Sequence, residues 1–145
     1  MSLRFLFRPL ALAAALFTPP MVSAAMTQTE INDALRANSS IYNALFTAAV
    51  IHHVADTCDT LGGPGRLERV AFFLPLYRQA RSMGFSRRQI ESFVDDKAEQ
   101  EQMRQLVYRY MERQGVAPTE AAAVCAWGRQ QIEERTPIGR RLSER

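Results

Sequence analysis

The sequence has few of the residues that mark an active site or a metal site. Its 145 residues include only two cysteines and two histidines. It contains no H-E-x-x-H, C-x-x-C-H or G-x-S-x-G motif, no phosphate-binding P-loop and no Rossmann glycine pattern. From these absences we predict no catalytic residue, no metal site and no cofactor, although catalytic residues brought together from distant positions would leave no such motif.

Apolar runs long enough to span a membrane are also missing. The chain opens with two arginines, an apolar stretch over residues 10–17, two prolines and a short run of small residues. This order is typical of a cleavable secretory signal peptide, whereas a membrane-spanning helix needs about 20 consecutive apolar residues. We therefore predict a signal peptide over residues 1–25, a mature domain over residues 26–145 outside the cytoplasm, and no membrane span after cleavage.

Strong charge of one sign is missing from the mature chain. The full chain has 18 Lys+Arg and 15 Asp+Glu. Two of the basic residues, Arg4 and Arg8, lie in the predicted signal peptide, which leaves 16 basic against 15 acidic residues and a net charge of +1. Because this excess is so small, the basic composition does not indicate a nucleic-acid partner.

Strand patterns are absent as well, and helical patterns follow one another along the mature chain. Capping boxes that begin at Thr27 and Ser86, together with a cap at Asp96, mark the starts of three helices. The helix after Asp96 carries a complete apolar stripe at helical spacing, made of Met103, Leu106, Val107, Tyr110 and Met111. We predict an all-α, single compact domain of five or six helices.

The remaining helices are less regular. The first stretch should run from Thr27 to about residue 57, with a possible interruption at residues 38–40. Another is expected over residues 66–83, and a last long helix over about residues 118–135. Pro75 lies inside the second of these and cannot donate a backbone hydrogen bond, so it should kink or split that helix.

Both histidines lie near the end of the first helical stretch. His52 shares a helical face with Leu45 and Ala48, which predicts that this face packs on the core with His53 at its edge. A metal site made of the two histidines and Asp56 is the alternative. Adjacent residues on a helix point about 100° apart, so we favour packing over metal binding.

The two cysteines are Cys58, after the first stretch, and Cys125, in the last helix. In an exported protein an even pair predicts a structural disulfide. Closing a loop of roughly 67 residues should stabilise the fold by about 4 kcal/mol in the chain-entropy model. A redox-active pair is the alternative, but catalytic cysteines usually lie close together in sequence. We also expect Gly128, one turn from Cys125, to let another backbone approach closely.

Pairs of like charges offer the other candidate sites. Asp95-Asp96 and Glu133-Glu134 are paired carboxylates of the kind that hydrolytic enzymes use, but Asp96 is better explained as a helix cap and Glu133-Glu134 as a solvated helix face. Arg87-Arg88 open a short helix, where positive charge opposes the helix dipole. We interpret these arginines as solvated, with contact to an acidic partner or lipid as the alternative.

The tail after the last helix has the most function-like pattern. Ile138 and Leu142 are four positions apart and form one apolar edge. Two explanations stay open: the edge folds back on the domain's own core, with Gly139 allowing close approach, or it docks in a partner's groove while Arg140 pairs with acidic side chains. Ile138, Gly139, Arg140 and Leu142 are our candidate binding residues.

Several of these features together resemble one known family. The run GFSRRQIESFV at residues 84–94, the Cys58/Cys125 pair, Gly128-Arg129 and the closing TPIGR at residues 136–140 follow the order and spacing of a secreted alphaproteobacterial family, domain of unknown function 5333. The resemblance covers about residues 31–142. It implies a location in the envelope of a Gram-negative cell, and it implies no activity.

We predict a non-enzymatic periplasmic protein that binds an unknown envelope protein, as an accessory subunit, inhibitor or assembly factor. A small envelope enzyme acting on cell-wall or small-molecule substrates and a periplasmic acid-stress chaperone are the alternatives. A perturbed carboxylate in a deep polar cleft would favour the enzyme. A dry core with a flat, partly apolar surface would favour the binding protein.

Overall fold

The computed structural model describes residues 25–145, so the predicted signal peptide lies almost entirely outside the described residues. Six α-helices form one compact domain, which confirms the predicted all-α architecture. The elements are α1 (Gln28–Ala37), α2 (Ser39–Thr57), β1 (Leu61–Gly62), α3 (Arg66–Ser82), α4 (Arg87–Asp95), α5 (Lys97–Arg113), α6 (Ala121–Glu133), the 3-10 helix η1 (Gly139–Arg141) and β2 (Ser143–Glu144). None of these helices combines the length and apolar character that a membrane crossing requires.

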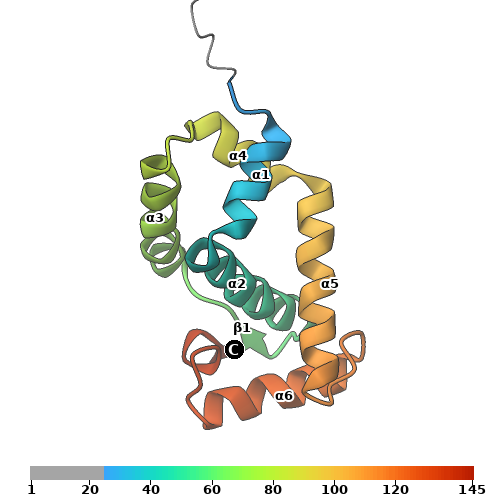
Figure 1. Ribbon diagram of the computed structural model, residues 1–145. Coiled ribbons are helices and arrows are strands. Elements are labelled where there is room, and N and C mark those ends of the chain that lie inside the picture. Colours follow the sequence, from blue (N-terminus) through green and yellow to red (C-terminus); the bar gives the residue numbers. More distant parts are fainter. Residues whose placement is uncertain (1–24) are drawn as a thin grey trace, which may run out of the picture.

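Helix α2 runs through the middle of the molecule and contacts most of the other helices (Figure 1). Helix α3 lies along one side of α2 and α5 along another, while α6 contacts the far end of α2. Helices α1 and α4 pack against each other at the opposite end, and α4 connects α3 to α5. The tail then returns to α6 and β1.

The predicted caps start the helices where the sequence places them. The Thr27 backbone N–H donates to the Glu30 carboxylate at 2.7 Å, and the Glu30 N–H donates to the Thr27 hydroxyl at 3.3 Å. Ser86 forms the same kind of capping box at the start of α4. Asn38 both ends α1 and caps α2, since its side chain accepts from the Ile41 N–H at 3.1 Å. The expected interruption of the first stretch is therefore confirmed as a break between two helices.

The buried apolar residues form two clusters, one toward each end of α2. The larger joins the second half of α2 to β1, α5, α6 and the tail; its members are Val50, Ile51, Val54, Cys58, Leu61, Val107, Met111, Val116, Val124, Trp127 and Leu142. The smaller joins α1, α4 and the ends of α2 and α3; its members are Ile31, Leu35, Ile41, Ala80, Phe85 and Phe93. Val107 and Met111 are the buried residues of the stripe predicted on α5.

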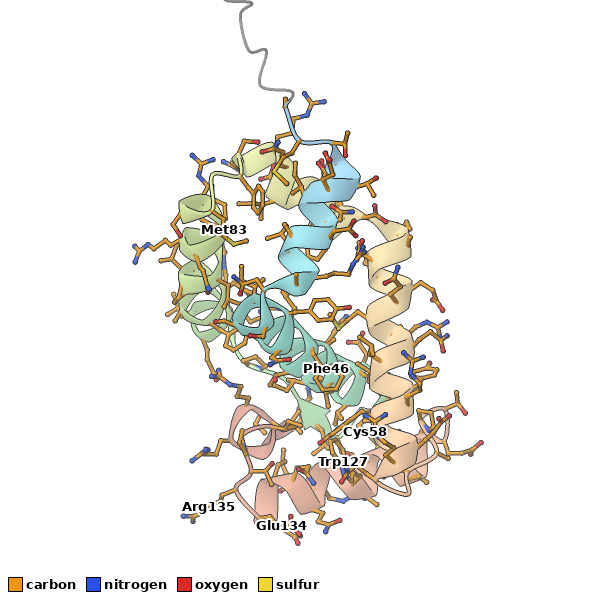
Figure 2. The ribbon with its side chains drawn as sticks, viewed as in Figure 1. Phe46, Cys58, Met83, Trp127, Glu134 and Arg135 are labelled. Atoms are coloured by element: carbon orange, nitrogen blue, oxygen red, sulfur yellow. A yellow bond between two sulfur atoms is a disulfide. The ribbon has the colours of Figure 1, made fainter. Side chains whose placement is uncertain are left out.

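A disulfide holds the larger cluster. Cys58 and Cys125 are joined with their Cα atoms 5.5 Å apart, which confirms the predicted bridge. Figure 2 shows Cys58 close to Trp127, where the end of α2 meets α6. The expectation for Gly128 is wrong in one respect, because side chains rather than a backbone approach it. A Cβ added there would lie 2.7 Å from Leu61 Cδ1 and 2.8 Å from Val54 Cγ1.

Helix α6 ends at a left-handed residue that is not glycine. Arg135 has a φ of 52°, and the Thr136 N–H donates to the Gln131 carbonyl at 3.2 Å, the pattern of a Schellman turn. Figure 2 shows Arg135 at the outer end of α6, where the chain reverses. The tail then packs on α6, β2 pairs antiparallel with β1, and the Arg145 N–H donates to the Thr60 carbonyl at 2.9 Å.

Two predicted details of the elements are wrong. No strand pattern occurs in the sequence, yet β1 and β2 form a two-residue pair, because the tail is held beside β1 by its own packing. The last helix begins at Ala121 rather than at Pro118, since the Glu120 N–H donates to the Ala117 carbonyl at 3.2 Å and closes a turn before the helix.

Candidate functional site: an apolar groove beside helix α3

Two connected hollows lie between α2 and α3 and together form an open groove that reaches α4, the α2–α3 groove. The hollow near the tail measures about 660 Å³, and the hollow near α4 about 600 Å³. Leu45, Phe73 and Val94 line both hollows, so the groove is continuous. Most of the other lining residues are also apolar, as is typical of a ligand-binding concavity.

The floor of the groove is one face of α2. Leu45, Ala48 and His52 line it, and this is the face that the sequence predicted to pack on the core. That prediction is wrong for His52, whose side chain is 74% exposed. The second half of α2 buries Val50 and Val54 instead, in the larger cluster. The first part of the groove face also packs on the core, since Ile41 belongs to the smaller cluster and Leu45 packs against it, whereas His52 is exposed at the groove.

The outer wall of the groove is α3, which is mostly exposed. Of its residues only Ala80 is buried. Pro75 does not split the helix, which continues from Arg66 to Ser82. Large apolar side chains are exposed along it and on to α4: Leu67 (86%), Val70 (56%), Phe73 (39%), Leu74 (40%), Met83 (37%) and Val94 (53%). Large apolar side chains are normally buried against the rest of a domain, so the domain's own packing does not account for these side chains.

Positive charge gathers at the end of the groove near the tail. Arg69, Arg141 and Arg145 line this end. The Arg141 guanidinium lies 4.7 Å from the centre of the Phe72 ring and 3.6 Å from the Glu68 carboxylate. Such stacking keeps the guanidinium at the groove while leaving other donors free.

The end of the groove near α4 carries both signs of charge. Arg87, Glu91 and Asp95 line it, and Arg87 Nε donates to the Glu91 carboxylate at 2.6 Å. This hydrogen bond raises the pKa of Arg87. The groove is therefore electrostatically uneven, with three arginines at one end, of which Arg141 pairs with Glu68, and the Arg87–Glu91 pair with Asp95 at the other.

The model of a family of unknown function, DUF5333, matches residues 33–143. The chain belongs to this family. Membership in DUF5333 confirms the family predicted from the order and spacing of the sequence motifs. Searches of curated proteins and of solved structures gave no match. The DUF5333 description supplies no activity.

Three of the four candidate binding residues of the tail pack on the domain itself in this DUF5333 chain. Leu142 is only 7% exposed in the larger cluster, and Ile138 packs against the same cluster. Gly139 is buried, and a Cβ added there would overlap the Gln131 carbonyl. Arg140 is exposed. A role for these four residues in binding a partner stays a prediction, and the arginines of the tail that line the groove are their neighbours.

The two histidines of the DUF5333 chain have different surroundings. His52 Nε2 lies 3.2 Å from the Asp56 carboxylate at the edge of the groove. The His53 ring lies 2.9 Å from the Pro118 carbonyl oxygen and packs against Tyr108. Within residues 25–145, no three His, Cys, Asp or Glu side chains come together as metal ligands.

The paired carboxylates lie apart from the groove floor. Asp96 caps α5 by accepting from the Ala98 N–H at 2.8 Å, as predicted for a helix cap. Glu133 and Glu134 are exposed at the end of α6. Of these four carboxylates only Asp95 lines the groove, in the hollow near α4 that His52 does not line.

A buried polar cluster joins α1 to α5 away from the groove. The Glu99 side chain is 10% exposed and pairs with Arg36, whose pKa is raised chiefly by this hydrogen bond. The Asn32 amide donates to Glu99 at 3.3 Å. Burial and the charge of Glu99 raise the pKa of Tyr42. Glu99 Oε2 is buried without a hydrogen-bond partner among the described residues, and its charge is compensated by Arg36. The cluster accounts for the attachment of α1 to α5.

The groove residues of α3 are the ones that sequence reasoning missed. The signal was present, because positions 67, 70 and 74 form one apolar stripe while positions 72 and 76 place further large apolar residues on the opposite side of the helix. A single buried face cannot cover such a set. A helix with large apolar residues on more than one side therefore indicated either burial on several sides or apolar surface exposed for binding.

Proposed function

We propose that the protein is a non-enzymatic, periplasmic accessory protein that binds another protein through the α2–α3 groove. The observation that carries the proposal is the exposure of apolar side chains along α3, next to an apolar groove. Monomeric soluble proteins rarely expose contiguous apolar patches larger than a few hundred Å², and larger patches mark interaction sites. Docking of a helix in an apolar groove is a common mode of peptide recognition.

The periplasmic location rests on two features. The Cys58–Cys125 disulfide suits an oxidising compartment, because cytosolic thiols are kept reduced. The predicted signal peptide supplies the route of export. Fractionation of the producing cell, with the intact mass of the protein, tests both: loss of residues 1–24 or 1–25 and release with periplasmic contents are expected. A full-length chain recovered with membranes would contradict the location.

The binding proposal is tested by crosslinking from the groove in the intact cell. A photo-crosslinking amino acid replaces Phe73 in the groove wall, and the same residue replaces Gln102, exposed on α5, as the matched control. One adduct of fixed mass from position 73, and none from position 102, is the expected result. The absence of a protein adduct from position 73, in cells where the variant is folded and oxidised, would contradict the proposal.

The alternatives predict different outcomes of the same experiment. An acid-stress chaperone would yield many adducts, mainly after a shift to low pH, and would keep denatured clients soluble. A small-molecule enzyme would yield no protein adduct. The lining of the groove does not favour the enzyme, because it is mainly apolar. Its one histidine, His52, is exposed and lies beside Asp56.

A further inference from the structure

We infer that the occupant of the α2–α3 groove is an amphipathic helix of a partner protein, with an apolar face and acidic residues at one end. The inference rests on the proposed function and names the chemistry of the partner. It is carried by the dimensions of the groove, by the apolar surface that continues beyond it, and by the positive charge at one of its ends.

The dimensions of the groove fit a helix of about four turns. Its floor on α2 extends from Ile41 to Asp56, a length of about 22 Å at a rise of about 1.5 Å per residue. The two hollows, of about 660 and 600 Å³, follow one another along this floor. A helix whose apolar residues recur every three or four positions places successive side chains in the two hollows.

The apolar surface beyond the groove distinguishes a protein occupant from other ligands. Leu67, Val70 and Leu74 are exposed on α3 but do not line either hollow. A small amphiphile inside the groove would leave these side chains in water, whereas a partner protein covers the groove and the outer face of α3 together. A flat membrane surface contacts the outer face but does not fill a concave groove.

The distribution of charge selects an acidic partner. Helix α3 and residues 139–145 together carry seven arginines and two carboxylates, Glu68 and Glu144. Helices α4 and α5, over residues 87–113, carry six basic and six acidic residues. The positive excess is therefore confined to the wall of the groove and the tail beside it, although the mature chain is nearly neutral.

The arginines at this end have donors available for a ligand. Arg69 and Arg145 make no ion pair within residues 25–145. Arg141 makes one long contact with Glu68, at 3.6 Å through a single guanidinium nitrogen, which leaves its other donors free. Carboxylates accept two parallel hydrogen bonds from a guanidinium, so aspartate and glutamate suit these positions. Asp56 is nearby but lies 3.2 Å from His52. Acidic residues at one end of the occupant would meet Arg69, Arg141 and Arg145.

The test uses the oxidised mature protein and three labelled 18-residue helical peptides that share one apolar face. The peptides carry glutamates, glutamines or lysines at one end, and fluorescence anisotropy gives each Kd at low and high salt. We expect the glutamate peptide to bind about tenfold more tightly than the glutamine peptide at low salt, because several exposed ion pairs together contribute about one order of magnitude. High salt should remove this difference.

Charge exchange provides the matched control. In the double variant Arg69→Glu and Arg145→Glu the preference should reverse, with the lysine peptide binding most tightly. The double variant Arg109→Glu and Arg113→Glu changes the net charge equally on exposed positions of α5, outside the groove, and should keep the preference for glutamate. Circular dichroism of each variant confirms that it is folded.

The outcomes separate this inference from the proposed function. Equal binding of the three peptides would overturn the acidic partner, while an adduct from position 73 in cells would leave protein binding in place. Failure of all three peptides would overturn the helical occupant. Binding to phosphatidylglycerol vesicles that is lost in the groove variant, without peptide binding, would show that the basic apolar face serves a membrane and would overturn the inference as well.

Discussion

Helices α3 and α6 are both rich in apolar residues, yet one is exposed and the other forms part of the core. Helix α6 buries Val124, Trp127 and Gly128 and carries one half of the disulfide. Helix α3 buries only Ala80, although its exposed residues include Leu67. The apolar content of a helix therefore does not reveal whether its side chains stabilise the fold or remain available for another molecule; its contacts with the rest of the domain do.

The two helices differ in what they contribute: α6 stabilises the fold, whereas α3 offers exposed apolar surface. The larger cluster, the disulfide and the β1–β2 pair all lie around α6. They join α6 to the end of α2, to β1, to α5 and to the tail. Helix α3 contacts α2 and α4 but buries only Ala80. We expect substitutions around α6 to change the free energy of unfolding, and substitutions on α3 to change binding with little effect on that free energy.

The largest expected effect follows from opening the disulfide. Cys58→Ser, like Cys125→Ser, should lower the free energy of unfolding by about 2–5 kcal/mol, because the closed loop restricts the unfolded chain. Urea unfolding followed by circular dichroism measures this difference. A reductant should destabilise the native protein by a similar amount and leave the double serine variant unchanged. Equal stability of native and variant protein would show that α6 is held by packing alone.

A matched pair of leucines tests the comparison directly. Leu61→Ala removes a side chain that is 0% exposed and should cost about 2–5 kcal/mol. Leu67→Ala makes the same chemical change at a side chain that is 86% exposed and should stay within about 0.5 kcal/mol of the native protein. A large loss for Leu67→Ala, measured in the monomer, would mean that α3 contributes to the folded domain more than its exposure indicates.

A smaller effect is expected where the tail meets α6. Gly139→Ala places a Cβ against the Gln131 carbonyl, so the tail must move, at a cost of about 1–3 kcal/mol. The Arg145 amide should then exchange its hydrogen faster, because its bond to the Thr60 carbonyl depends on the position of the tail. Gly65→Ala is the control, since an added Cβ there meets no atom within 4 Å. Unchanged exchange in Gly139→Ala would show that the tail adapts without leaving β1.

The smallest effect concerns acid, far from α6. Hydrogen bonds from the Thr27 backbone N–H and hydroxyl hold the pKa of Glu30 below its usual value. These hydrogen bonds therefore raise the free energy of unfolding at pH values above the usual glutamate pKa. The contribution is lost as the pH falls through the lowered pKa of Glu30. A carbon-detected NMR titration should show the lowered pKa, and Glu30→Gln should flatten this part of the stability profile. An ordinary pKa for Glu30 would mean that the capping box is open in solution.

Local patterns predicted much of the fold. The capping boxes at Thr27 and Ser86, the cap at Asp96 and the disulfide were all correct, because each depends on a few neighbouring residues or on the parity of the cysteines. The turn at the end of α6 was not predictable in the same way. Arg135 takes a left-handed conformation that usually indicates glycine, so the sequence gives no local sign of it.

The candidate site was largely beyond prediction for a different reason. The face of α2 that spacing assigns to the core does pack there at Ile41 and Leu45, but only the path of α3 decides that it stays exposed at His52. The spacing of Ile138 and Leu142 identifies an apolar edge that could fold back on the core or dock to a partner, and only the tertiary packing shows that these side chains join the larger cluster. Spacing along one helix identifies an apolar face, but the tertiary arrangement decides what covers it.

The disulfide also changes what a protease can do to this molecule. Helices α3, α4 and α5 all lie between Cys58 and Cys125, so they form part of a covalently closed ring. The exposed arginines of α3 are natural cleavage points for trypsin-like enzymes, yet a single cut there opens the ring without separating the two fragments. In a compartment that contains proteases, the helix with the least protection can be nicked while the two halves of the molecule remain attached to each other.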